Sequence, residues 1–66
     1  MKGPLSKPTV KLIGQDGNAF SVMGRVKKAL KQSGADKEYI DKYLNAATSG
    51  DYDHLLVVSM EYVEVE

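Results

Sequence analysis

Two short breaks, at Gly34-Ala35 and at Ser49-Gly50, interrupt a chain whose apolar residues otherwise repeat with a helical period. Gly34 follows the last periodic residue of its segment, where the left-handed backbone conformation that glycine favours closes a helix. Asp36 and Asp51 come soon after the two breaks and are good N-cap residues for the helices that follow. The first connection is so short that the helices on either side of it should form an αα-hairpin.

The small size of the chain and its lack of cysteine limit how such a fold is held together. A chain of 66 residues buries only about 60% of the surface that its unfolded form exposes. Without cysteine, disulfides and thiolate zinc sites are excluded. Stability must therefore come from the packing of one small hydrophobic core. The apolar fraction of 42% and the charged fraction of 27% are those of a globular domain and not of a disordered chain.

Each helical segment has an apolar face that the fold should bury. In the segment 19–33, which Asn18 or Asp16 would cap, this face consists of Val22, Met23, Val26, Ala29 and Leu30. In the segment that runs from the Asp36 cap through Thr48, it consists of Tyr39, Ile40, Tyr43, Leu44 and Ala47. In the segment after Asp51, it consists of Tyr52, Leu55, Leu56 and Ser59, with Met60 beside them.

Both ends of the chain favour strands. Residues 9–13 are β-favouring, alternate partly between apolar and polar, and end at Gly14. Residues 57–61 fit a helix and a strand equally well, because Val57 and Val58 are β-branched. From Glu61 to the end of the chain the pattern has a period of two, which indicates a closing strand over 61–66.

The two end strands are natural partners, because their charges are opposite. Lys7 and Lys11 would face acidic residues of the last strand, namely Glu61, Glu64 and Glu66. The predicted fold is α+β and mostly helical, in the order β-α-α-α-β, with the terminal strands in a two-stranded antiparallel sheet. Residues 1–8 contain Gly3, Pro4 and Pro8 and are predicted to be a flexible arm ahead of a single compact domain over 9–66.

Charge is distributed unevenly along the chain, although the formal net charge is zero. Residues 1–33 carry seven basic residues against Asp16, and residues 34–66 carry eight acidic residues against Lys37 and Lys42. The strand pairing and the acidic residues at helix starts account for part of this asymmetry. The basic face of the segment 19–33 is not explained in this way.

That basic face is the strongest candidate site. Its members are Phe20, Arg25, Lys27, Lys28 and Lys31, and Phe20 either turns toward the core or lies exposed among the cations. Lysine and arginine bind phosphates, and an aromatic ring can stack on a base, so the face suggests nucleic-acid binding. The neutral net charge argues against a strong nucleic-acid binder. The helical segment lacks asparagine and has its one glutamine, Gln32, at its far end, so it is poorly supplied for reading bases. A solvated, lysine-rich helix face is the simpler interpretation.

A second cluster, Asp51, Asp53 and His54, offers oxygen and imidazole ligands for a metal ion, with Glu61 seven residues further along. Its spacing matches no recognised metal-binding motif. Asp51 is also expected to cap a helix, and acidic residues in a first helical turn are favoured by the helix dipole. The cluster is therefore a weak metal site, and no cofactor is predicted.

Other motifs for chemistry are poorly supported. The spacing Gly14-Gln15-Asp16-Gly17 matches a GXXG loop, but Asp16 would repel a phosphate and no Gly-Lys-Ser/Thr follows. A strand-to-helix turn explains these residues better. His54 is the only histidine, and none of the serines lies in a nucleophile elbow, so the chain is not expected to be an enzyme.

Two segments together resemble short proteins of bacteria, their phages and their plasmids; these segments are Leu12–Phe20 (LIGQDGNAF) and Thr48–Leu56 (TSGDYDHLL). The likeness covers about residues 9–66 and leaves out the arm at 1–8. No activity is assigned to that group. The resemblance therefore implies a bacterial or mobile-element origin and one compact domain, and it transfers no catalytic residue.

These observations predict a small non-enzymatic binding or regulatory module that acts through protein–protein contact, including head-to-tail self-association. Nucleic-acid binding through the basic face is the first alternative, and a metal-assisted site at Asp51, Asp53 and His54 is the second. The sequence lacks a signal peptide and a run of about 20 apolar residues, so a cytoplasmic protein that does not enter a membrane is expected.

Overall fold

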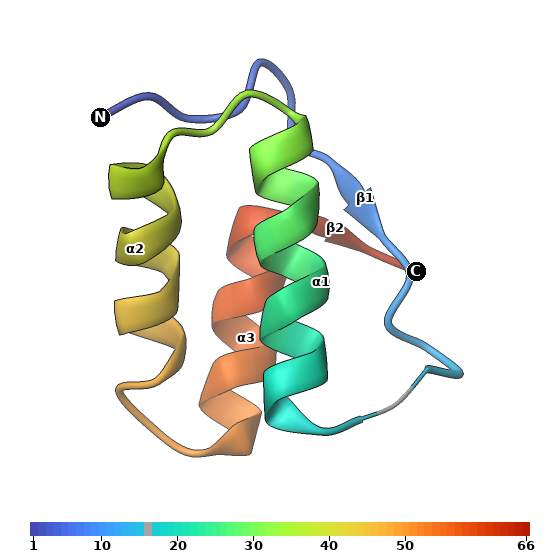
Figure 1. Ribbon diagram of the computed structural model, residues 1–66. Helices are drawn as coiled ribbons and strands as arrows, with labels where there is room; N and C mark the ends of the chain where they lie inside the picture. Colours follow the sequence, from blue (N-terminus) through green and yellow to red (C-terminus); the bar gives the residue numbers. More distant parts are fainter. Residues whose placement is uncertain (16) are drawn as a thin grey trace.

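The described residues form five elements in succession, and the chain reverses direction between each element and the next (Figure 1). The computed structural model describes residues 1–15 and 17–66. Its elements are β1 (Thr9–Val10), α1 (Ala19–Gln32), α2 (Lys37–Ala47), α3 (Tyr52–Tyr62) and β2 (Glu64–Val65). The three helices lie side by side, and the two strands lie at one edge of the bundle. The predicted α+β class and the order β-α-α-α-β are confirmed.

The two strands pair in parallel, so the predicted antiparallel sheet is wrong. Thr9 lies opposite Glu64, and Val10 lies opposite Val65. The physical reason is that the chain reverses direction at every connection from β1 through the three helices to β2 (Figure 1). An even number of reversals restores the original direction, and opposite charges on the two strands cannot change that.

Both strands are also shorter than predicted. The helical conformation continues through residues 57–61 and ends only at Tyr62, which settles the ambiguity of that segment. Beyond β1 and β2 the pairing continues at Glu66, whose carbonyl oxygen accepts the amides of Leu12 at 2.8 Å and Ile13 at 3.1 Å. The ends of the chain are therefore joined by main-chain hydrogen bonds over more residues than the strands themselves contain.

The start and end of α1 follow from local chemistry. The side chain of Asn18 accepts a hydrogen bond from the amide of Phe20 at 2.9 Å. Asp16, the other predicted cap, lies outside the described residues. At the far end Gly34 has a φ of +99°, and the amide of Ala35 donates to the carbonyl oxygen of Leu30 at 3.0 Å. This is the left-handed helix end that the sequence predicts.

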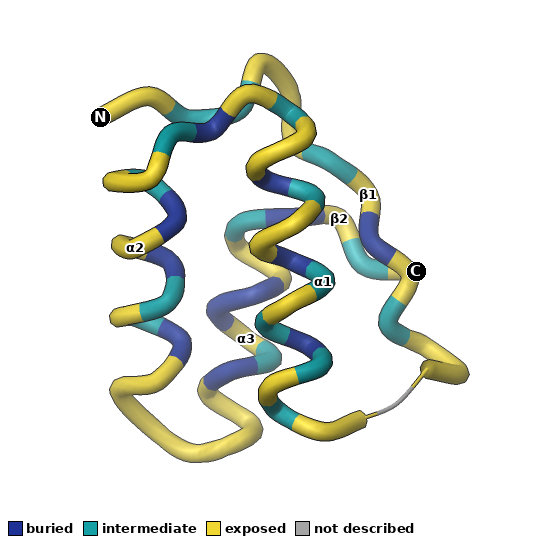
Figure 2. Tube along the Cα trace, in the orientation of Figure 1, coloured by how far each residue is buried: buried dark blue, intermediate teal, exposed yellow. Residues whose placement is uncertain are grey.

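The core lies where the helices face one another (Figure 2). The predicted faces of α1 and α2 are confirmed, since their buried members are Val22, Val26, Leu30, Ile40, Tyr43 and Ala47. Asp36 caps α2 by accepting the amide of Tyr39 at 2.9 Å. That hydrogen bond, helped by a second one from the amide of Lys2, lowers the pKa of Asp36.

A buried hydrogen bond joins α2 to α3. The hydroxyl of Ser59 donates to the carbonyl oxygen of Leu55 at 2.8 Å, so it accepts from the hydroxyl of Tyr43, 2.7 Å away. Burial raises the pKa of Tyr43, and the hydrogen bond with Ser59 opposes this in part. The ring of Tyr62 packs edge-on against Tyr43 and Tyr39, with ring centres 5.2 and 5.6 Å apart. These contacts favour the helical conformation of Tyr62 over the predicted strand.

The buried face of α3 differs from the predicted one. Its buried members are Leu55, Val58 and Ser59. Tyr52, which was predicted to be a core residue, has 42% of its surface exposed, and Met60 has 54% exposed. Leu56 is half-buried. The buried face thus keeps Leu55 and Ser59 from the prediction but takes Val58 in place of Tyr52 and Leu56.

The segment before β1 runs over the turn between α1 and α2 (Figure 1). Its main chain is hydrogen-bonded there, from the amide of Leu5 to Ser33 and from the amide of Asp36 to the carbonyl oxygen of Lys2, both at 2.9 Å. Gly3 lies against Tyr39, since a Cβ at residue 3 would be 3.0 Å from that ring. These contacts join the segment to the α1–α2 turn, and the flexible arm stays a prediction.

One of the charge pairs predicted between the chain ends forms. The Nζ of Lys7 lies 3.7 Å from Oε1 of Glu64, and it is the one ion pair within residues 1–15 and 17–66. Both side chains are largely exposed, and such pairs contribute about 0–1 kcal/mol. Charge pairing therefore adds little to the stability of the fold, and most of the charged side chains remain available to solvent.

Candidate functional site

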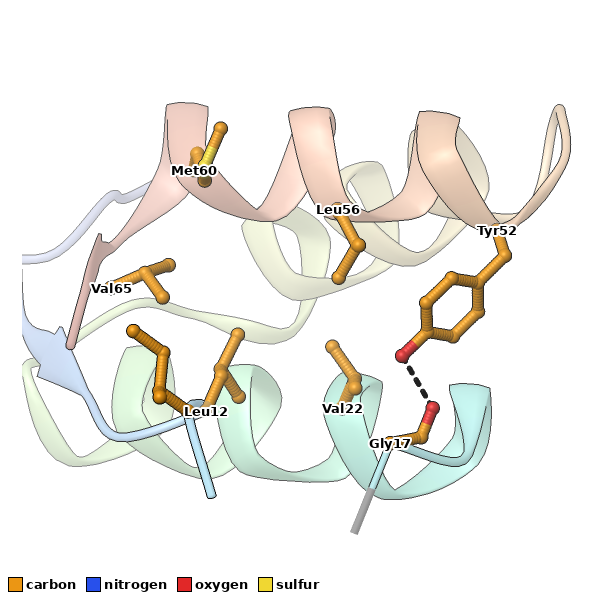
Figure 3. A pocket seen from close by; sticks show the side chains of 8 residues that line it. Leu12, Gly17, Val22, Tyr52, Leu56, Met60 and Val65 are labelled. Atoms are coloured by element: carbon orange, nitrogen blue, oxygen red, sulfur yellow. Dashed lines mark hydrogen bonds between the residues drawn. The ribbon is translucent and has the colours of Figure 1, made fainter. Parts of the chain in front are cut away.

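An apolar groove lies between α3, the loop after β1 and the first turns of α1 (Figure 3). Its volume is about 390 Å³. Its lining residues come from four separate parts of the chain and are Leu12, Ile13, Gly17, Val22, Tyr52, Leu56, Met60 and Val65. Apolar side chains that line an open groove are the usual basis of a binding surface in a small protein.

One wall of the groove is a row of side chains on α3. Tyr52, Leu56 and Met60 are spaced by four residues, and all three line the groove. In Figure 3, Tyr52 and Leu56 point toward the groove, and Met60 lies further along the same helix. Residues with this spacing lie above one another along a helix. The sequence analysis placed all three with the core, but the structure places them on a side of α3 that the fold leaves open. From Tyr52 to Met60 the helix rises over eight steps, which is about 12 Å.

The hydroxyl of Tyr52 closes one end of the groove by donating a hydrogen bond to the carbonyl oxygen of Gly17 (Figure 3). This contact ties the first turn of α3 to the segment just before α1. Among the described residues, the Tyr52 hydroxyl is the one polar side-chain group in the lining, and it is engaged. The remaining surface of the groove therefore offers methyl, thioether and aromatic groups.

The opposite wall is the loop after β1. Leu12 and Ile13 are held there by their hydrogen bonds to the carbonyl oxygen of Glu66, and Gly14 then turns the chain with a φ of +80°. A left-handed residue is needed at this point, and glycine adopts it without steric cost. Ile13 has 72% of its surface exposed, although it belongs to the most apolar stretch of the loop.

The residues of the predicted basic face lie on α1, but the structure divides them between two hollows. Arg25 and Lys28 face β1 and share a pocket of about 250 Å³ with Lys11, which the sequence analysis had assigned to strand pairing. Lys27 and Lys31 face α2 and share a different hollow with Lys37 and Asp41.

The remaining member of the basic face, Phe20, lines neither hollow. It has 81% of its surface exposed, which answers the question that the sequence left open. Phe20 lies on the outer side of α1, four residues before Gly24, and a Cβ at Gly24 would meet nothing within 4 Å. The ring therefore stands next to a bare stretch of helix surface.

Arg25 is the least satisfied of the cationic residues. Its side chain is half-buried, and its Nε is buried without a hydrogen-bond partner among the described residues. Buried N–H groups are nearly always paired in folded proteins. An unpaired guanidinium N–H at the edge of a pocket lined by two further cations is thus a feature that the fold alone does not explain.

The acidic cluster at the start of α3 is arranged as a helix cap. Asp51 accepts the amide of His54 at 2.9 Å. The Nε2 of His54 lies 3.0 Å from the hydroxyl of Ser49 and 2.9 Å from the carbonyl oxygen of Ala46, so the imidazole is engaged with the end of α2.

The same contacts explain Gly50, because a Cβ there would lie 2.8 Å from Cγ of His54. Within residues 1–15 and 17–66, no three acidic or histidine side chains converge as metal ligands. The weak candidates Asp51, Asp53 and His54 are thus not brought together around a common point in the described structure.

The groove was missed by sequence reasoning, although a signal was present. Tyr52, Leu56 and Met60 form a second apolar row on a helix that already has a buried face. None of the helices in the described part of the chain is long and apolar enough to cross a membrane. Comparison of the chain with protein-family models, with curated proteins and with solved structures found no match. The resemblance to short bacterial, phage and plasmid proteins therefore stays a prediction.

Proposed function

We propose that this chain is a small non-enzymatic binding module, and that its groove docks an amphipathic helix of a partner protein. The observation that carries the proposal is the open apolar lining of about 390 Å³ in a domain of 66 residues. Ile13, Tyr52 and Met60 each keep a large part of their surface in contact with solvent. Burial of such surface by a partner is favourable by about 25 cal/mol per Å².

The shape of the groove favours a helix as its occupant. The row on α3 extends over about 12 Å, and a helix that presents apolar residues at positions i, i+3, i+4 and i+7 covers about 10.5 Å with those anchors. The groove lies along α3 with the loop after β1 as its other wall (Figure 3). A partner helix of two to three turns would therefore lie beside α3 with its apolar side inward.

The charged residues next to the groove indicate which charge a partner should carry. Asp53 directly follows Tyr52 and Glu61 directly follows Met60, and both carboxylates are exposed on α3. Val57, also exposed, lies between them on the helix. Acidic groups at the rim of an apolar surface favour a partner with lysine or arginine at the edges of its apolar side. The proposed occupant is therefore a basic amphipathic helix.

The chemistry of the lining supports binding over catalysis. The hydroxyl of Tyr52 is occupied by Gly17, and the other side chains of the described lining are aliphatic or thioether groups. Acid–base or nucleophilic catalysis requires a titratable group that reaches the substrate. A surface of this composition is suited to hydrophobic association.

A designed peptide tests the proposal. The probe is a helical peptide with leucine at i, i+3, i+4 and i+7 and lysine beside that face, titrated into the ¹⁵N-labelled chain and followed by NMR. We expect saturable shifts at Leu12, Ile13, Leu56 and Met60, and weaker binding of a peptide in which glutamate replaces each lysine. The salt dependence of the difference should follow the screening of exposed charges.

Met60→Gln and Val57→Gln form a matched pair for this test. Both residues are exposed on α3, but only Met60 lines the groove. We expect Met60→Gln to weaken binding of the lysine peptide strongly and Val57→Gln to weaken it little. Equal effects of the two variants, or equal binding of the lysine and glutamate peptides, would contradict the proposal. Self-association of the free chain that Met60→Gln abolishes would assign the groove to a second copy instead.

A second candidate function, binding of single-stranded nucleic acid along α1, is favoured by one observation. Phe20 is 81% exposed beside the open surface at Gly24, with Lys27 and Lys31 further along the same side of the helix. An exposed ring can stack on a base while lysines contact the neighbouring phosphates. The acidic second half of the chain would oppose nucleic acid elsewhere on the molecule.

Fluorescence anisotropy with a labelled oligothymidylate tests this second function. Binding of the oligonucleotide should weaken steeply with added salt. Phe20→Ala should also weaken this binding, whereas Met60→Gln should leave it unchanged. Absence of binding at low salt, or binding that Phe20→Ala does not alter, would remove nucleic acid from consideration for this face.

A further inference from the structure

A pocket of about 250 Å³ between β1 and α1 brings together three cationic side chains from two parts of the chain. Lys11 is the residue that follows β1, and Arg25 and Lys28 lie on successive turns of α1. The other lining residues are Thr9, Val10, Ala29 and Gln32. We propose that this pocket binds a phosphate group, carried by a small phosphate monoester or present as inorganic phosphate. The site is separate from the apolar groove and does not depend on the function proposed for it.

The guanidinium of Arg25 is the central element of the site. Its Nε is buried and has no hydrogen-bond partner in the described part of the chain. Arginine presents its N–H groups as a planar fork that matches two oxygens of a phosphate, and Nε is one member of that fork. A bound phosphate oxygen would satisfy an N–H that the fold leaves unpaired, which is a gain that a lysine at this position would not provide.

The lining has the charge and the donors that a phosphate requires. Lys11 and Lys28 add two ammonium groups, and no carboxylate is among the described lining residues. The hydroxyl of Thr9 and the amide of Gln32 supply neutral donors at the edge. A phosphate monoester carries a charge of about −1.5 to −2 at neutral pH, so the pocket should favour it over a carboxylate of single charge.

The backbone explains why the pocket and the groove do not merge. Lys11 lines the pocket, whereas the next residue, Leu12, lines the groove on the other side of the chain. Among the described residues, the pocket and the groove share no lining residue, with residues 9–11 on the pocket and residues 12–13 on the groove. This segment therefore separates a cationic surface from an apolar one.

The single arginine of the chain makes the proposal directly testable. The Nε–Hε group of Arg25 gives a unique signal in a ¹H–¹⁵N spectrum, which can be followed during titration with inorganic phosphate at constant ionic strength. We expect a saturable shift of this signal, with acetate producing a much smaller one. Parallel titrations with O-phosphoserine and with a nucleoside monophosphate distinguish the sources of the group, since the tighter binder identifies the class of monoester.

Three variants separate a built site from diffuse positive charge. Lys28→Gln, inside the pocket, should weaken phosphate binding several-fold, and Lys27→Gln, its neighbour on the α2 side, should change it by less than about twofold. Arg25→Lys keeps the charge but loses the fork, and we expect about tenfold weaker binding, measured from backbone amide shifts. Because Lys28 is exposed, the Lys28→Gln variant remains informative about phosphate binding even if an Arg25 variant is destabilised.

Two results would overturn the proposal. One is an Nε–Hε signal that does not shift, or shifts without saturation and equally with acetate and phosphate. The other is an equal loss of phosphate binding in Lys27→Gln and Lys28→Gln, which would show that only the total charge of α1 matters.

Discussion

The two sides of α3 differ in what covers them, although both are apolar. On one side Leu55, Val58 and Ser59 are buried against the other helices, and Ser59 hydrogen-bonds to Tyr43. On the other side Tyr52, Leu56 and Met60 line an open groove. The difference teaches that α3 carries more apolar surface than this fold can bury. A domain of this size buries a smaller share of its surface than a larger one does, and the apolar row left open here is the surface on which the proposed binding depends.

Two adjacent leucines provide the largest expected contrast between these sides. Leu55→Ala removes a buried side chain from the core and should lower the free energy of unfolding by about 2–5 kcal/mol. Leu56→Ala removes a half-buried side chain from the groove and should cost about 1 kcal/mol. Urea unfolding followed by circular dichroism measures both. Because small domains have about 3–5 kcal/mol in total, Leu55→Ala should leave much of the chain unfolded. Similar losses in the two variants would show that the groove is closed in solution.

Two tyrosine hydroxyls, that of Tyr43 at the buried side of α3 and that of Tyr52 at the groove side, should give a smaller contrast in stability when each is removed. Tyr43→Phe breaks the buried hydrogen bond to Ser59 and should cost about 1 kcal/mol in the free energy of unfolding. Tyr52→Phe breaks the exposed contact with Gly17 and should cost about 0.5 kcal/mol. Thermal unfolding compares the stabilities. Tyr52→Phe should in addition shift the NMR signals of the loop after β1, and a larger loss of stability in Tyr52→Phe than in Tyr43→Phe would reverse the comparison.

Alkaline pH should lower the free energy of unfolding through the buried hydroxyl of Tyr43. Burial raises the pKa of Tyr43 in the folded chain above its ordinary value of 10.0, and Tyr62 is shifted in the same direction. The stability that this shift reflects is fully present below pH 10.0 and is lost as the pH rises through the folded pKa, because the unfolded chain releases the proton first. Urea unfolding between pH 9 and pH 11 should show this decline. Tyr43→Phe should have a flatter profile, and an unchanged profile would argue against burial of that hydroxyl.

The smallest effects on stability are expected for exposed residues of α3. Met60→Gln and Val57→Gln should each change the free energy of unfolding by no more than about 0.5 kcal/mol. Their melting temperatures should therefore be nearly the same as that of the parent chain, even though only Met60→Gln is expected to impair peptide binding. A clear loss of stability in Met60→Gln would show that this side chain is part of the core, and the groove would then be smaller than described.

The candidate sites were predicted from sequence only in part. The basic residues of α1 were found because they are close together in the sequence and lie on one helix. Their division between two hollows depends on β1 and α2, which pack on opposite sides of α1. Lys11 lines the first of these only because the chain folds back, and it forms no ion pair with the last strand among the described residues. The groove was missed because its walls come from distant segments.

The sequence by itself determined the local features of this protein. The caps at Asn18, Asp36 and Asp51 and the end of α1 at Gly34 depend on hydrogen bonds between residues a few positions apart, and all were predicted. The apolar faces of α1 and α2 were predicted for the same reason, since a helical period is visible within a dozen residues.

Only the tertiary structure decided which way the terminal strands pair, where α3 ends and which of its apolar rows is buried. The strand direction follows from the number of reversals along the whole chain, and pairwise charge cannot reveal it. Tyr62 remains helical because the rings of Tyr39 and Tyr43 pack against it. Each outcome depends on a neighbour that is distant in the sequence, and local propensity carries no information about such neighbours.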